Sequence, residues 1–77
     1  MLPTSWTPVN SSAISRVKFT PNRFDSLGTL YIEFNEGAVY SYTDVQESRV
    51  EALMSSASPG SYYKSAIAGQ YASQREG

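Results

Sequence analysis

The sequence contains neither cysteine nor histidine in its 77 residues. The thiolate nucleophile, the most common general base and the usual transition-metal ligands are therefore all missing. Disulfides cannot stabilise the fold either. We therefore predict a non-enzymatic protein with no cofactor and no metal site.

Two short patterns with catalytic precedent do not change this prediction. Ser61 and Lys64 match the S-x-x-K pattern of serine acyl-enzymes, but Ser15 and Lys18 match it as well. A pattern that occurs twice in so short a chain, with no partner motif, selects poorly. A capping serine and a solvated lysine explain Ser61 and Lys64 better.

The chain also lacks an excess of charge of one sign. Six lysines and arginines face seven aspartates and glutamates, for a net charge of −1. Dedicated nucleic-acid-binding domains are usually basic, because phosphate contacts dominate their affinity. The balance argues against strong non-specific binding to nucleic acid and leaves room for a small local basic patch.

Long hydrophobic runs are absent. No stretch approaches the roughly 18 apolar residues of a membrane span, and the first residues have neither the basic nor the apolar region of a secretory signal. We expect one small cytoplasmic domain that does not contact membranes, since a chain of this length forms a single core.

What is present predicts three regions. Residues 1–8 form an extended arm, because Pro3 and Pro8 disfavour a helix there. Residues 9–71 form the folded domain, and residues 72–77 form a C-terminal tail. Trp6 either docks on the domain or anchors a partner, and docking is the favoured interpretation.

Three strands are predicted within the domain. Residues 13–20 and 30–34 alternate between apolar and polar side chains, and the third strand follows Gly37 and ends near Thr43. Residues 35–37 suit a three-residue hairpin loop closed by Gly37, which places Ile32 opposite Tyr40 and Leu30 opposite Tyr42. Both tyrosines then face the core. In the loop before this hairpin, Phe24 and Leu27 are expected to cover one end of the core.

Two helices follow. Thr43 with Gln46, or Asp44 with Glu47, offers a capping box for a helix that begins near residue 43. Its apolar stripe comprises Val50, Leu53, Met54 and Ala57. Residues 58–60 end this helix, and Ser61 caps a short second one that contains Tyr63. The predicted fold is α+β, a three-stranded antiparallel meander followed by one α-helix and a short second helix packed on one face.

The pattern resembles the KTSC domain family over residues 9–71. The resemblance is carried by the LYIEF strand, the Tyr40-Ser41-Tyr42 motif, the Tyr62-Tyr63 pair, Gly37 and Gly60. Gln46 departs from it, since the family often has proline at the helix start. The family is named after the C-terminus of some lysyl-tRNA synthetases and includes free-standing bacterial and phage-type proteins. The resemblance implies a bacterial or phage-infected host cell and suggests RNA binding.

The candidate binding residues lie on the sheet face that the helices leave open. That face is expected to carry Ile14, Arg16, Lys18, Tyr31 and Val39. An aromatic ring between cations on an open sheet is typical of single-stranded nucleic-acid binding. The same face, with Trp6, also suits a protein partner or self-association. A merely solvated polar face is the third interpretation, and it is common in antiparallel sheets.

Overall fold

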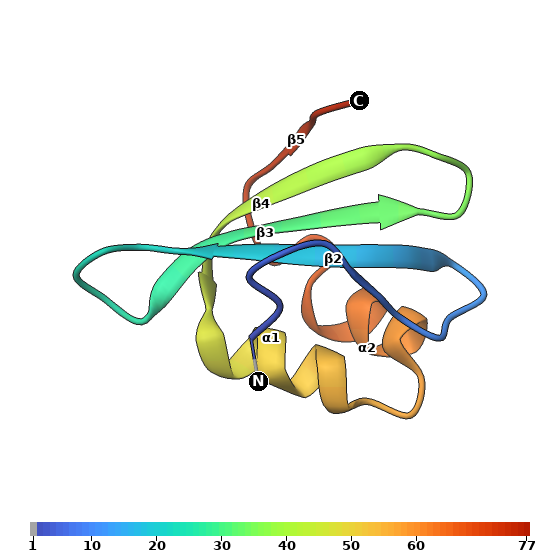
Figure 1. The fold of residues 1–77 in the computed structure, drawn as a ribbon, viewed down its shortest axis with the longest axis horizontal. Helices are drawn as coiled ribbons and strands as arrows, with labels where there is room; N and C mark the ends of the chain where they lie inside the picture. Colours follow the sequence, from blue (N-terminus) through green and yellow to red (C-terminus); the bar gives the residue numbers. More distant parts are fainter. Residues whose placement is uncertain (1) are drawn as a thin grey trace.

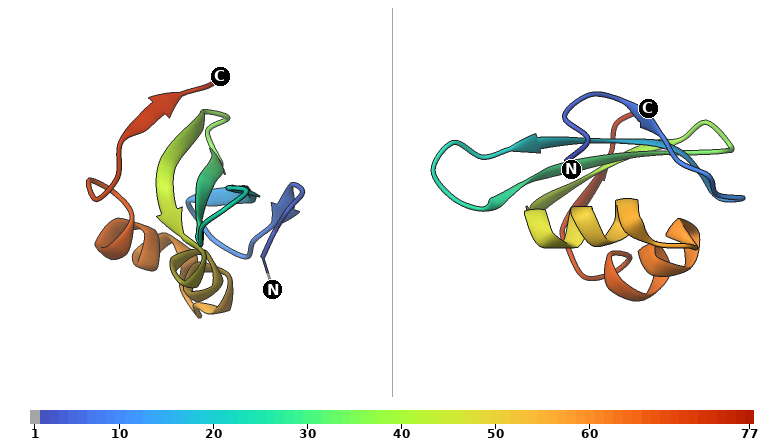
Figure 2. Two further views of the ribbon diagram at one scale, coloured as in Figure 1. Left: turned by 90° about the vertical axis from the view of Figure 1, so that its left-hand side faces the viewer. Right: turned by 60° about the horizontal axis from the view of Figure 1, so that its bottom comes forward.

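The computed structural model describes residues 2–77, which form a curved antiparallel sheet with two helices against one face (Figure 1). The strands are β1 (Thr7–Pro8), β2 (Ile14–Pro21), β3 (Leu27–Phe34), β4 (Val39–Gln46) and β5 (Ser73–Arg75), and the helices are α1 (Glu47–Ser55) and α2 (Pro59–Ala66). Seen along the sheet, both helices lie on the same side of it (Figure 2). The α+β class is as predicted.

The sheet has five strands, where the sequence predicted three. They are arranged in the order β1-β2-β3-β4-β5, so the chain adds a short strand at each edge of the meander. The N-terminal arm supplies β1, and the C-terminal tail supplies β5. One further backbone hydrogen bond holds each segment to the sheet. The Phe19 N–H donates to the Pro3 carbonyl at 2.7 Å, and the Thr43 N–H donates to the Ala72 carbonyl at 3.1 Å. The arm and the tail thus pair the N–H and C=O groups that three strands alone would leave exposed at the sheet edges.

The β3–β4 hairpin has the predicted register. Ile32 pairs with Tyr40 and Leu30 pairs with Tyr42. Gly37 closes the turn with a φ of 105°, a conformation that side chains with a Cβ rarely adopt. Because side chains alternate along a strand, this turn fixes which residues of β4 face the helices.

A bulge in β2 corrects one predicted placement. The pairing of β2 with β3 shifts between Ile14 and Arg16, which turns Ile14 to the helix side of the sheet. Ile14 is only 1% exposed and belongs to the hydrophobic core. The prediction that Ile14 lies on the open face was wrong, because strict alternation from Arg16 does not hold across a bulge.

The boundary between β4 and α1 also differs from the prediction. β4 continues to Gln46, and the helix begins at Glu47, without a side-chain hydrogen bond at its N-cap. Leu27 pairs with Gln46 and Gly28 with Val45, so β4 stays paired with β3 up to Gln46, across an irregularity at which Asp44 has a φ of 58°. Neither predicted capping box forms. α1 nevertheless buries Val50 and Leu53, as its apolar stripe predicted.

The second helix begins three residues earlier than predicted, because Ser58 and not Ser61 is its N-cap. Pro59 occupies its first turn, where a missing N–H costs no hydrogen bond, and Ser58 precedes it. Gly60 therefore lies inside α2. A Cβ atom there would approach the Ser11 Oγ to 3.2 Å, so this glycine lets the helix pack closely on the segment before β2.

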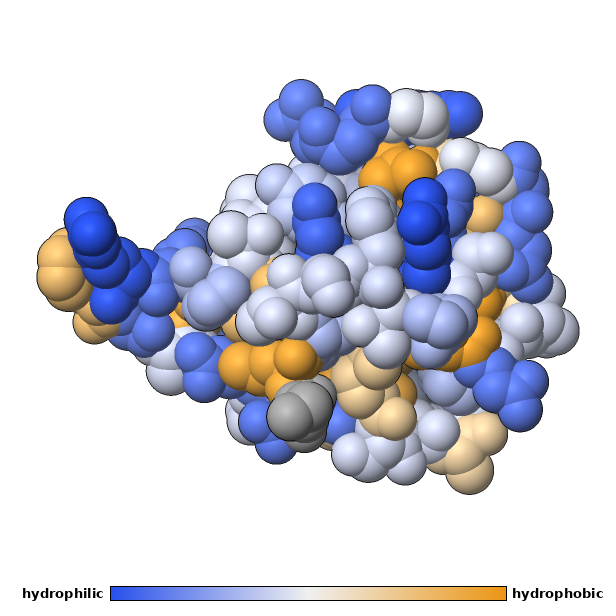
Figure 3. All heavy atoms as spheres, viewed as in Figure 1, coloured by the Kyte–Doolittle hydropathy of each residue, from blue (hydrophilic) through white to orange (hydrophobic). Residues whose placement is uncertain are grey.

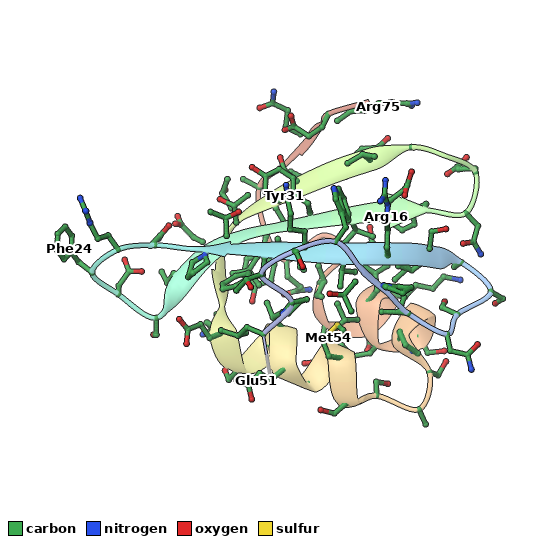
Figure 4. The ribbon with its side chains drawn as sticks, viewed as in Figure 1. Arg16, Phe24, Tyr31, Glu51, Met54 and Arg75 are labelled. Carbon is green, nitrogen blue, oxygen red and sulfur yellow. The ribbon has the colours of Figure 1, made fainter. Side chains whose placement is uncertain are left out.

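The core lies between the helices and the sheet. Its buried members are Ile14, Val17, Phe19, Leu30, Ile32, Tyr42, Val45, Val50, Leu53, Ala66 and Ile67. Phe24 does not cover its end as expected, because its side chain is 92% exposed at the tip of the β2–β3 loop (Figure 4). Within residues 2–77, no helix is long and apolar enough to cross a membrane.

Candidate binding face of the sheet

The sheet face turned away from the helices carries a cluster of aromatic and charged side chains, here called the open-face cluster: Trp6, Arg16, Lys18, Tyr31 and Glu33. Strand register explains why four of them meet. Lys18 lies directly opposite Tyr31 across β2 and β3, and Arg16 lies opposite Glu33. Figure 4 shows Arg16 and Tyr31 projecting from the sheet on the side away from the helices. The sequence predicted this grouping for Arg16, Lys18 and Tyr31.

Trp6 completes the cluster from the N-terminal arm. Thr7 pairs with Val17, which brings the preceding residue over β2. The Trp6 ring centroid lies 4.6 Å from the Arg16 Cζ and 5.4 Å from the Lys18 Nζ. Both distances are within the range of cation–π attraction. The docked interpretation of Trp6 is confirmed, and its ring is half-buried.

Lys18 lies between two aromatic rings. Its Nζ is 4.9 Å from the Tyr31 ring centroid, in addition to its contact with Trp6. Among residues 2–77, no carboxylate forms an ion pair with Lys18. Its ammonium group thus keeps its N–H donors for an external acceptor.

Arg16 is different, because it forms an ion pair with Glu33. The Arg16 Nε donates a hydrogen bond to the Glu33 Oε1, and the two side chains are 45% and 24% exposed. This pair cancels one of the two positive charges of the cluster. The face is therefore less basic than Arg16 and Lys18 alone suggested.

The C-terminal segment partly covers the β4 side of the face. This cover was not predicted from the sequence. Ser41 is 6% exposed, and its hydroxyl donates to the Glu76 Oε2 at 2.7 Å. Val39 lies on this face opposite Glu33, as predicted, and is half-buried. The sequence gives little indication that the C-terminal segment pairs with β4, because its strand, residues 73–75, is only three residues long. The accessible part of the face is centred on β1 to β3.

The space-filling view is consistent with a mixed surface. Hydrophilic and intermediate residues cover most of the side shown, and hydrophobic residues appear in separate patches (Figure 3). No group of three or more acidic, histidine or cysteine side chains that could hold a metal ion occurs within residues 2–77. The open-face cluster thus offers rings, one free ammonium group and hydrogen-bonding groups.

The other tyrosines singled out in the sequence lie on the helix side of the sheet. Tyr42 is 4% exposed and packs in the core, whereas Tyr40 and Tyr63 are half-buried beside it. The hydroxyl oxygens of Tyr42 and Tyr63 lie 2.6 Å apart in a hydrogen bond. Burial, together with this hydrogen bond, raises the pKa of Tyr42 well above its usual value. Tyr42 stays neutral and joins β4 to α2.

These features define a small α+β domain with helices on one face of an antiparallel sheet and an aromatic–cationic cluster on the other. The KTSC domain family model matches residues 10–71, so the chain belongs to the KTSC family. The chain is also similar to the crystal structure of a KTSC domain protein from Yersinia pestis. The two share 29% sequence identity and a TM-score of 0.85, over 95% of this chain and 97% of the other. A search of curated proteins finds no match.

Proposed function

We propose that this KTSC domain is a non-enzymatic binding module of the cytoplasm that holds single-stranded nucleic acid, such as RNA, on its open-face cluster. The observation that carries the proposal is the position of Lys18 between Trp6 and Tyr31, at 5.4 Å and 4.9 Å from the two ring centroids. Aromatic rings stack on bases, and an ammonium group beside them contacts phosphate.

The charges of the cluster suggest weak binding. Arg16 is paired with Glu33, and the chain has a net charge of −1. Few counterions would be released from the nucleic acid, and their release supplies most of the non-specific affinity. We therefore expect dissociation constants in the micromolar range or weaker, with stacking as the main contribution.

The test is a titration of short single-stranded RNA into the wild type and two variants at two salt concentrations. Tyr31→Ala should weaken binding about tenfold, since stacking on one aromatic ring contributes about 1–3 kcal/mol. Lys18→Glu should also weaken binding and reduce its salt dependence, because one phosphate contact is lost. Thermal melts establish that both variants remain folded.

Lys64→Glu is the matched control, because it makes the same charge change at an exposed position on α2, behind the sheet. It should change affinity much less than Lys18→Glu. Equal losses from the two substitutions would mean that only overall charge matters. Absence of RNA binding at low salt and about 100 μM protein, a typical range for non-specific contacts, would exclude the proposal.

A protein partner is the second candidate, and the Arg16–Glu33 ion pair favours it. An ion pair beside Trp6, Tyr31 and Val39 makes a mixed apolar and charge-balanced surface, which is typical of non-obligate interfaces. Sedimentation of the wild type and of Tyr31→Ala tests self-association through this face. Association that is insensitive to salt and lost in Tyr31→Ala would support an interface between two copies of the chain.

A further inference from the structure

A second site candidate lies on the opposite side of the sheet, where residues of β3, β4 and α2 line an open hollow of about 320 Å³. Four aromatic rings line it, those of Phe34, Tyr40, Tyr42 and Tyr63. Glu36 from the hairpin turn and Gly69 contribute to its rim. It shares no residue with the open-face cluster.

The rings meet edge to face. Phe34 and Tyr63 lie 5.3 Å apart with their planes at 69°, and Tyr42 and Tyr63 lie 5.9 Å apart at 72°. Tyr40 meets Phe34 at 6.0 Å and 78°. Rings at such angles do not stack face to face on one another. The faces of aromatic rings carry negative potential, which attracts cations.

The hollow has no positive group in its lining. Glu36 is the one charged residue among those that line it, and its side chain is exposed at the rim. Burial, together with the hydrogen bond to Tyr63, raises the pKa of the Tyr42 hydroxyl, which therefore stays neutral. Glu36 therefore gives the lining its only charge, which is negative.

The chain itself already places a cation at the edge of this hollow. Arg75 in β5 pairs with Tyr40 in β4, and the Arg75 Cζ lies 5.9 Å from the Tyr40 ring centroid. The face of the Tyr40 ring therefore receives a guanidinium group in the structure. Arg75 is exposed and does not line the hollow, so a second cation has room inside it.

We propose that this aromatic hollow binds a substituted ammonium group, of the kind carried by choline-like small molecules or by a methylated lysine. The methyl groups contact Phe34, Tyr42 and Tyr63, and the carboxylate of Glu36 lies at the rim to complement the charge. A methylated ammonium group fits better than a bare one, because it is less strongly hydrated and therefore loses less hydration free energy on entering the aromatic hollow. The proposal is independent of nucleic-acid binding by the open face.

The test is an NMR titration of the full chain with choline and with 3,3-dimethylbutan-1-ol, its uncharged analogue of the same shape. Choline should shift the signals of the residues that line the hollow. The alcohol should bind about two- to fivefold more weakly, the ratio that a cation–π contribution of about 0.5–1 kcal/mol implies. Equal affinity for both compounds, or no shifts in the hollow at about 100 mM choline, a concentration well above the dissociation constant of a weak site, would overturn the proposal.

Three variants test the contribution of charged side chains to choline binding. Glu36→Gln should weaken choline binding about two- to fivefold, as expected for loss of one exposed charge. Glu51→Gln, which changes another exposed carboxylate on α1, should leave choline binding unchanged. Arg75→Gln should tighten binding, because it removes a competing cation from the face of Tyr40. The proposal fails if Glu36→Gln and Glu51→Gln behave alike or if Arg75→Gln weakens binding.

A peptide containing trimethyllysine distinguishes the two sources of the ammonium group. Tighter binding of the peptide than of choline, with additional shifts along β5, would identify a protein ligand. Equal binding, with shifts confined to the hollow, would identify a small molecule. Either result supports an ammonium site, whereas the same peptide with unmodified lysine should bind more weakly than the methylated form.

Discussion

The hydroxyl oxygens of Tyr42 and Tyr63 lie 2.6 Å apart, joining the central hairpin to helix α2. We predict that Tyr42→Phe destabilises the fold by about 1 kcal/mol, the usual contribution of one hydrogen bond. Tyr63 is half-buried and lines the open aromatic hollow, so water can replace the lost partner of its hydroxyl. Chemical denaturation measures the change. Tyr63→Phe should cost a similar amount, and the double variant should cost less than the sum, since both substitutions remove the same bond.

The same pair predicts a loss of stability at alkaline pH. Burial and the Tyr63 hydroxyl raise the pKa of Tyr42 in the folded state, whereas an unfolded tyrosine titrates near its ordinary pKa of about 10. The folded chain therefore retains a proton that the unfolded chain loses, and the free energy of unfolding decreases as the pH rises above about 10. Chemical denaturation at several pH values between neutral and about 11 measures this decrease in the free energy of unfolding. An equally steep decrease in Tyr42→Phe would assign the effect to other groups.

Gly37 should resist substitution because of its backbone conformation alone. Its φ is +105°, and a Cβ atom there would meet nothing within 4 Å. Gly37→Val should destabilise the fold by about 1–3 kcal/mol, since a β-branched residue strongly disfavours positive φ. Gly37→Asn should cost less, because asparagine tolerates such conformations better. Thermal melts that rank the two variants the other way would contradict this explanation.

Gly28 should resist substitution for a different reason, which is space. A Cβ atom at this position would lie 2.5 Å from both the Phe19 Cζ and the Thr20 carbonyl oxygen. Gly28→Ala should therefore cost about 1–3 kcal/mol or more, as overpacked positions do. Gly77→Ala is the matched control, since nothing lies within 4 Å of its added Cβ. Equal melting temperatures for the two variants would mean that β2 and β3 separate at little cost.

The sequence determined the central hairpin and the main core positions. The loop of residues 35–37 specifies its own conformation through Gly37, and alternation then places Leu30, Ile32 and Tyr42 on the same side. Both signals are local, because they depend on neighbours along one strand pair. The family resemblance, confirmed over residues 10–71, rests on these same positions.

The candidate binding face was only partly predictable. Strand alternation brought Arg16, Lys18 and Tyr31 together, but it also assigned Ile14 to that face. The bulge before Arg16 turns the Ile14 side chain to the helix side of the sheet, and no residue type in this stretch predicts a bulge. The Arg16–Glu33 ion pair likewise depends on which residues of β2 and β3 are opposite one another.

The tertiary structure alone decided the two ends of the chain and the aromatic hollow. Residues 7–8 and 73–75 have little strand preference of their own and are extended because β2 and β4 offer unpaired edges. Trp6 reaches Lys18, and Arg75 reaches Tyr40, only after these edges are filled. Tyr63 meets Tyr42 only after α2 packs on the sheet. Such contacts join residues far apart in sequence, so they follow from the packing of the whole domain, whereas the hairpin follows from its own residues.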